Sequence, residues 1–181
     1  MPIPVHTLDP YDVVFTHNYE GVTRTWCISR MELKLRSLPA SGLGTPVEAD
    51  GLTYCPVYDP SRPGVPLGKY LHVGIDPDFA EHCMRERGIE QHRLQPLIDM
   101  PYKLFEMLPP VIYTDERDGD WKTLLDGHHR YVAAHRKGLK SVRSFIGTYA
   151  FTDQFLVSGL PDVEDGYQHS FSGIPSGHTV N

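Results

Sequence analysis

The chain has 181 residues, of which 40% are hydrophobic and 22% charged, an ordinary globular composition that excludes disordered and fibrous architectures. Its net charge of -6 argues against a protein that coats nucleic acid without sequence preference, because such proteins need a surplus of Lys and Arg. The sequence has no apolar run of roughly 20 residues and no signal-peptide pattern at its start, so we expect a cytoplasmic protein with no membrane partner.

The first predicted elements are a β-hairpin and a short helix. β-favouring runs within residues 12–28 flank the turn-forming stretch 18–21. Ser29 with Glu32 three residues later reads as a capping box that starts a helix. The segment 39–68 is dense in Pro and Gly, which predicts a long irregular insertion, either a binding loop or an exposed excursion.

A strand and several helical pieces follow. Residues 70–75 predict a strand, and Asp76 as the cap predicts a helix over residues 77–87. Pro96 and Pro101 are expected to break the next region into short helices, since proline cannot continue the hydrogen-bond ladder of a helix. The second of these helices should turn its apolar side chains, Tyr102, Leu104, Phe105 and Leu108, toward a core.

The next elements form a strand, turn and helix unit. The runs 111–114 and 121–125 predict a β-hairpin, residues 128–137 a helix that ends at Gly138, and residues 141–146 a strand. We therefore expect one α/β (α+β) domain over residues 1–157, with an N-terminal extension and the Pro/Gly-rich insertion 39–68. The polar, Gly-rich stretch 158–181 predicts a loosely ordered tail.

The stretch Asp126-Gly127-His128-His129-Arg130 is the strongest candidate for a functional site. A strand that turns directly into a helix places backbone N–H groups and the positive end of the helix dipole at one point, which attracts anions. Gly127 permits the tight turn, and Arg130 can add a charged fork to a phosphate. His128 and His129 should point to different sides, so at most one faces the ligand.

Asp126 needs a separate explanation, because a carboxylate repels a neighbouring phosphate. It could hold a Mg²⁺ ion that bridges the phosphates, or it could accept the proton of an attacking hydroxyl group. The alternative is that Asp126 only caps the helix and that His128 and His129 are solvated.

The block 104–147 resembles the ParB/sulfiredoxin superfamily. The likeness is carried by Pro109-Pro110-Val111-Ile112, by the run from Leu124 to Ala134 around the Asp-Gly-His-His-Arg motif, and by Gly138-Leu139 before a strand. It implies a small mixed sheet with flanking helices, in which this turn grips nucleotide phosphates. Members include partition proteins that hydrolyse CTP on DNA, ParB-like nucleases, sulfiredoxin, and free-serine kinases that use ADP or ATP.

Departures from the individual branches narrow this implication. His128 stands where sulfiredoxin has its reactive cysteine, and the chain after Gly147 is too short for the helix-turn-helix region of a partition protein. The motif is most similar to the serine-kinase-like branch. That likeness implies Asp126 near the attacking hydroxyl, His128 and Arg130 on the phosphates, and a catalytic glutamate from the preceding helical region. Glu106 and Glu90 are the candidates, and Glu106 is the nearer to the shared block.

The leading hypothesis is an enzyme that transfers or hydrolyses a phosphoryl group, such as a small-molecule kinase. Its predicted cofactors are Mg²⁺, held by Asp126, and ATP, ADP or CTP, and its partner is a small-molecule phosphate acceptor. The predicted catalytic residues are Asp126, His128 and Glu106, and the predicted nucleotide-binding residues are Gly127, His128, His129 and Arg130.

Two other hypotheses stay open at this stage. One is a DNA-associated ParB-like binding protein or metal-dependent nuclease, in which the basic segment 130–143 meets phosphates. The other is a nucleotide sensor without turnover, whose ligand orders the segment 39–68. The phosphate acceptor, the base preference and the oligomeric state are open as well.

Overall fold

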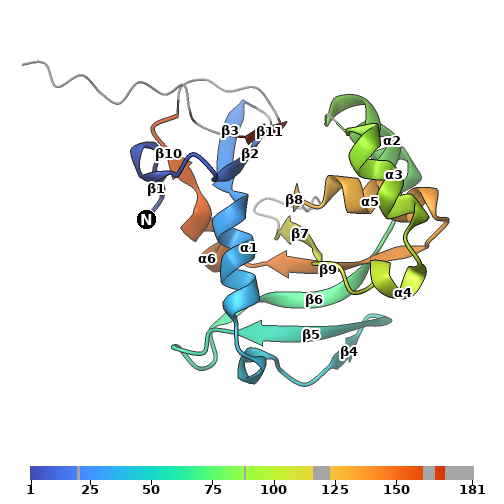
Figure 1. Ribbon diagram of the computed structural model, residues 1–181. Helices are drawn as coiled ribbons and strands as arrows, with labels where there is room; N and C mark the ends of the chain where they lie inside the picture. Colours follow the sequence, from blue (N-terminus) through green and yellow to red (C-terminus); the bar gives the residue numbers. More distant parts are fainter. Residues whose placement is uncertain (20, 88, 116–122, 161–165, 170–181) are drawn as a thin grey trace, which may run out of the picture. The chain divides into compact units, whose positions relative to one another are not determined.

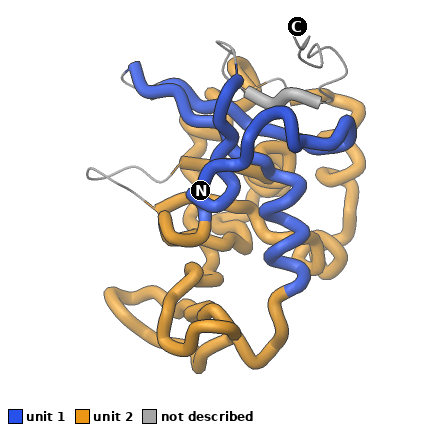
Figure 2. The backbone as a smooth tube through the Cα atoms, turned by 90° about the vertical axis from the view of Figure 1, so that its left-hand side faces the viewer, with its two compact units in different colours: residues 1–37, 152–181 blue, residues 38–151 orange. Residues whose placement is uncertain are grey.

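The computed structural model describes residues 1–19, 21–87, 89–115, 123–160 and 166–169. These residues belong to two compact units, one made of residues 1–37 and 152–181 and the other of residues 38–151 (Figure 2). Helices, antiparallel strands and a mixed six-stranded sheet together confirm the predicted α+β class. That the two units behave as one domain stays a prediction. No helix among the described residues is long and apolar enough to cross a membrane.

The first unit is built on the predicted hairpin. Strands β2 (Val13–Tyr19) and β3 (Val22–Cys27) pair antiparallel, which confirms the hairpin within residues 12–28. Strand β11 (Gly166–His169) pairs with the other edge of β2, so the expectation of a loose tail is wrong for these four residues. The shorter elements of this unit and its boundary are β1 (Ile3–Pro4) paired parallel with β10 (Val157–Ser158), the 3-10 turns η1 (Val5–Thr7) and η3 (Asp153–Phe155), and α6 (Tyr149–Thr152).

Helix α1 (Ile28–Ser37) confirms the predicted helix, but the predicted capping box is wrong. The helix begins at Ile28, so Ser29 already lies inside it. The Ser29 hydroxyl instead accepts the Val13 N–H at 3.2 Å and donates to Asp12 at 2.8 Å. A tertiary contact has therefore replaced the local cap, and it ties the start of α1 to the start of β2.

Asp12 is a buried carboxylate of the first unit, held by several donors. Arg30 pairs with it at 2.8 Å and the Asp9 N–H donates to it at 2.9 Å. Burial alone would raise its pKa, but the hydrogen bonds from Asp9, Arg30 and Ser29 outweigh burial and hold the pKa of Asp12 below the ordinary value of 3.8. Asp12 is therefore charged in the folded state at neutral pH.

The second unit contains a six-stranded sheet (Figure 1). Neighbouring strands pair antiparallel except β9 and β7, which are parallel. The strand order is β4 (Val47–Ala49), β5 (Leu52–Tyr58), β6 (Pro66–Gly74), β9 (Ser141–Gly147), β7 (Val111–Thr114) and β8 (Thr123–Asp126). The predicted β7–β8 hairpin is confirmed, while Trp121 and Lys122 of its predicted second run lie outside the described residues.

The prediction of an irregular insertion over residues 39–68 is wrong for β4, β5 and the start of β6, which together take up 13 of its 30 residues. The 3-10 turn η2 (Ala40–Gly42) and the loops between these elements are irregular. Pro56 lies in β5, where its carbonyl accepts the Gly44 N–H at 2.8 Å on the outer side of the strand. Since the amide position of a strand residue faces the same side as its carbonyl, the missing N–H of Pro56 does not interrupt the ladder to β6.

Helices α2 (Pro77–Glu86), α3 (Gln91–Asp99), α4 (Tyr102–Phe105) and α5 (His128–Arg136) belong to the second unit. The predicted cap of α2 is confirmed, because Asp76 accepts the N–H groups of Asp78 and Phe79. The predicted break at Pro96 is wrong, since Pro96 lies inside α3. Packing of α3 on α5 overrides the local cost of the proline.

The core of the second unit lies between the sheet and helices α2, α3 and α5, which Figure 1 shows on one side of the strands. Of the apolar residues expected there from the α4 region, Phe105 is buried, Leu108 packs against the core at its margin, and Tyr102 and Leu104 are exposed. The expectation is therefore wrong for these two, because a helix of four residues presents only part of its surface to the core.

Candidate functional site

The turn between β8 and α5 is shaped by a glycine that no other residue can replace without strain. Gly127 has a φ of +92°, in the left-handed region that side-chain-bearing residues rarely adopt. A Cβ atom at Gly127 would lie 3.1 Å from the Cα and Cγ2 atoms of Val111 and 3.2 Å from Nη2 of Arg130. The predicted tight turn is thus present, and the backbone of β7 passes directly beside it.

Arg130 folds back across this turn. Its guanidinium donates to Asp126 Oδ2 at 2.5 Å, to the Pro110 carbonyl at 2.8 Å, and to the Pro109 carbonyl. The two side chains of the ion pair are 13% and 17% exposed, so both remain in reach of solvent. The turn therefore brings the predicted carboxylate and the predicted phosphate ligand together, in a state in which each neutralises the other.

His128 lies in the interior. Its side chain is 1% exposed and is among the largest fully buried ones of the chain. The alternative in which both histidines of the motif are solvated is therefore wrong. The role predicted for His128, on the phosphates, requires the first turn of α5 to open, because no phosphate reaches a side chain with this burial.

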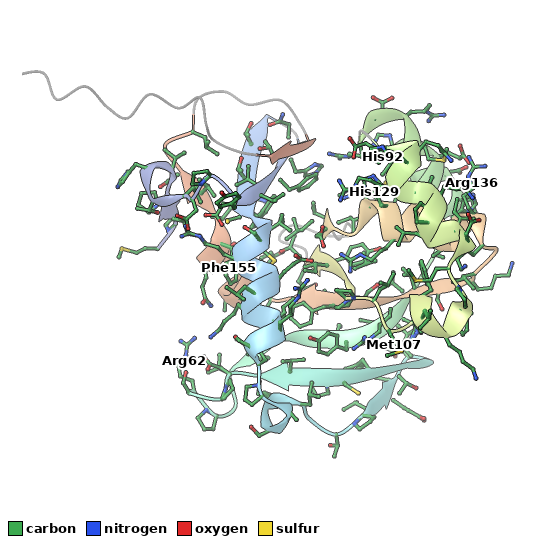
Figure 3. The ribbon with its side chains drawn as sticks, viewed as in Figure 1. Arg62, His92, Met107, His129, Arg136 and Phe155 are labelled. Carbon is green, nitrogen blue, oxygen red and sulfur yellow. The ribbon has the colours of Figure 1, made fainter. Side chains whose placement is uncertain are left out.

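His129 contacts the residue before the start of α3. Its Nε2 atom accepts the Glu90 N–H at 3.1 Å, so this nitrogen carries no proton. Burial is the largest cause that lowers the pKa of His129 below 6.5, and the neighbouring Arg93 lowers it further. Figure 3 shows His129 on α5 close to His92 of α3. His129 thus links two helices as a neutral ring.

The two candidate glutamates lie in different surroundings. Glu106 Oε2 pairs with Nε2 of His72 at 3.2 Å, whereas Glu90 forms an exposed pair with Arg93 at 3.4 Å. Glu106 also lines a small hollow together with Arg130, and the hollow has room for about one water molecule. The structure therefore brings Glu106 together with one member of the motif and places Glu90 beside His129.

Arg143 is a charged residue of this region that motif reading did not select. It lies on β9 and lines the same hollow as Glu106 and Arg130, whose other walls are apolar side chains from α4, β7, β9 and the Pro109 turn. In the sheet register Arg143 is opposite His72 of β6. The alternation of β9 was the available signal, since Arg143 stands between the buried residues Val142 and Ser144.

Three of the basic residues between 130 and 143 are engaged with protein partners. Arg136 contacts Met84 and Glu81, and Nζ of Lys137 donates to the carbonyls of Ile98 and Met100. Arg130 is turned into its ion pair with Asp126. Cations engaged in this way have fewer N–H donors left for the phosphates of a nucleic acid.

Asp126 is a lone candidate for a metal ligand. Among the described residues, no three His, Cys, Asp or Glu side chains are grouped as a metal ion would need. A Mg²⁺ ion commonly takes one or two protein carboxylates and completes its shell with phosphate oxygens and water. Asp126 offers one carboxylate of this kind.

Comparison with known proteins finds no family model that matches, no similar curated protein and no similar solved structure. The resemblance to the ParB/sulfiredoxin superfamily therefore stays a prediction that rests on the motif block of residues 104–147.

Proposed function

We propose that this chain binds a nucleoside di- or triphosphate with Mg²⁺ at the turn from Asp126 to Arg130 and transfers or hydrolyses a phosphoryl group there. The observation that carries the proposal is the Asp126–Arg130 pair at 2.5 Å, held across a left-handed Gly127 at the start of a helix. The motif resemblance supports the same conclusion, with ATP, ADP or CTP as the nucleotide.

The ion pair suggests how a carboxylate and a phosphate share one site. An incoming phosphate competes with Asp126 for the guanidinium of Arg130, because both are anions that accept the same fork of N–H donors. With Arg130 on a phosphate, Asp126 would no longer be paired with this guanidinium, and its carboxylate would be the group to hold Mg²⁺ or to accept a hydroxyl proton. Phosphate binding and the release of the carboxylate are then one exchange of partners.

The DNA-associated alternative has weaker support from the geometry. It requires the cations of residues 130–143 to face a common groove, and in the second unit Arg130 and Lys137 are both engaged with protein acceptors. A nucleotide needs only the turn and a few donors. The arrangement of charge therefore favours a small phosphorylated ligand.

The decisive experiment is a thermal-shift screen with ADP, ATP, CTP and GTP, each with and without Mg²⁺, followed by a turnover assay. A nucleotide at a hundred times its Kd stabilises the fold by about 2.7 kcal/mol. Asp126→Asn is expected to abolish turnover and the Mg²⁺-dependent part of the shift. Arg136→Gln, at the other end of α5, is the matched control and should behave as wild type. The proposal fails if no nucleotide shifts the transition or if Asp126→Asn turns over normally.

A further inference from the structure

A second group of polar side chains lies where β6 ends and β9 begins, outside the Asp126 turn. His72 of β6 and Arg143 of β9 are register partners, and Glu106, just after α4, reaches His72 across 3.2 Å. Glu106 and Arg143 both line the small hollow that Arg130 closes on one side. Glu106, Arg130 and Arg143 therefore line one concave place, and His72 lies beside it.

Arg143 is an unused donor at this place. Its guanidinium lies 5.7 Å from the centre of the Tyr70 ring, and it makes no hydrogen bond or ion pair with the residues that the structure describes. A guanidinium stacked on an aromatic ring keeps its edge N–H groups directed outward. Such an edge matches the two oxygens of a carboxylate or phosphate group.

Glu106 restricts which anion can use that edge. His72 occupies its Oε2 atom, and within the described residues Oε1 has no partner. The Glu106 side chain is 25% exposed, so solvent only partly screens the charge of its carboxylate. A plain anion at Arg143 would be repelled by this carboxylate, whereas an anion with an adjacent hydroxyl group can donate a hydrogen bond to it.

We propose that Arg143, Glu106 and His72 form the subsite for the phosphate acceptor, and that the acceptor is a small anion with a hydroxyl group next to its carboxylate or phosphate. Arg143 binds the anionic group, Glu106 accepts the hydroxyl hydrogen bond, and His72 positions Glu106. As an acceptor subsite it rests on the proposed function. Arg130 lines the hollow and also pairs with Asp126, so an acceptor at the rim of the hollow, on the exposed Arg143, lies beside the residue that holds the phosphate.

The test is an NMR titration of the full chain, labelled with ¹⁵N, that follows the Nε–H signal of Arg143. The probes are glycolate, which has a hydroxyl beside its carboxylate, and acetate, which has the carboxylate alone, at constant ionic strength. Glycolate should bind more tightly than acetate. Arg143→Gln should raise the Kd for glycolate about tenfold or more, because it removes charge-assisted hydrogen bonds; in that variant, backbone amides lining the hollow report binding.

Two further variants complete the design. Glu106→Gln should bind acetate more tightly than wild type does, since the repulsion is gone, and Arg136→Gln should match wild type. The subsite is refuted if neither probe gives a saturable shift, if wild type binds both probes equally, or if Arg143→Gln binds as wild type. Glycolate binding without any nucleotide binding would refute the proposed function and with it the acceptor role, and would leave Arg143, Glu106 and His72 as a hydroxy-acid site. Nucleotide binding without glycolate selectivity would refute only the subsite.

Discussion

Replacing Gly127 by alanine tests the turn on which the candidate site is built. A left-handed backbone costs alanine about 1–2 kcal/mol. The new Cβ would also meet the Val111 backbone and side chain at 3.1 Å, and a strand backbone cannot move aside as a flexible side chain can. Crowding of this kind costs about 1–3 kcal/mol. We therefore expect Gly127→Ala to lower the free energy of unfolding by about 2–5 kcal/mol.

Gly138, just beyond the other end of α5, is the matched control. Its φ is +73°, but a Cβ there would meet nothing within 4 Å. Gly138→Ala should therefore lower the free energy of unfolding only by the cost of placing alanine in a left-handed backbone. The loss of chain entropy in the unfolded state is the same for both variants. Equilibrium unfolding in urea, with an unchanged m-value, measures the difference as about 1–3 kcal/mol. If Gly127→Ala is no less stable than Gly138→Ala, the close approach of β7 to the turn is not a constraint.

Three other outcomes follow from the charged residues. Arg130→Ala should lower the free energy of unfolding by about 2–4 kcal/mol, because it removes the hydrogen bonds from Arg130 to Asp126 and to two prolyl carbonyls. Arg136→Ala should stay within about 0.5 kcal/mol of wild type in the same urea assay. Because the pKa of Asp12 is lowered in the folded state, its contribution to the free energy of unfolding is complete well above pH 3.8 and is lost as the pH falls through the folded pKa. The difference in free energy of unfolding between wild type and Asp12→Asn should therefore decrease as the pH is lowered. Because the pKa of His129 is lowered in the folded state, protonation of its ring destabilises the fold, and this loss of stability begins as the pH falls below 6.5. An NMR titration of the His129 ring should show a midpoint below pH 6.5. A midpoint above pH 6.5 would contradict the contact with Glu90.

Elements with a local signal could be predicted from the sequence. The α2 cap at Asp76, the glycine after α5 and the β7–β8 hairpin each depend on residues within a few positions of one another. Elements decided by distant contacts could not. Pro96 and the prolines of residues 39–68 predict interruptions of regular structure, but Pro56 lies in β5 with its missing N–H directed away from β6, and packing of α3 on α5 accommodates Pro96.

The same distinction applies to the candidate site. Asp126 and Arg130 are four residues apart at the start of a helix, so their proximity follows from helix geometry alone. His72 and Glu106 are 34 residues apart, and the fold of the second unit brings them together. A pairing of this kind has no signature in the order of residues, and Arg143 was not selected for the same reason.

The outer edge of the six-stranded sheet has a consequence for how this protein behaves in concentrated solution. An unpaired strand edge is a template onto which another molecule can add a strand, the first step of aggregation. Here the edge strand β4 has only three residues and carries Glu48 at its centre. Beyond it Gly44 already occupies the carbonyl of Pro56 in β5, and Pro56 has no N–H to offer. A short strand, a charge and a proline leave a neighbouring molecule few amide groups with which to continue the sheet.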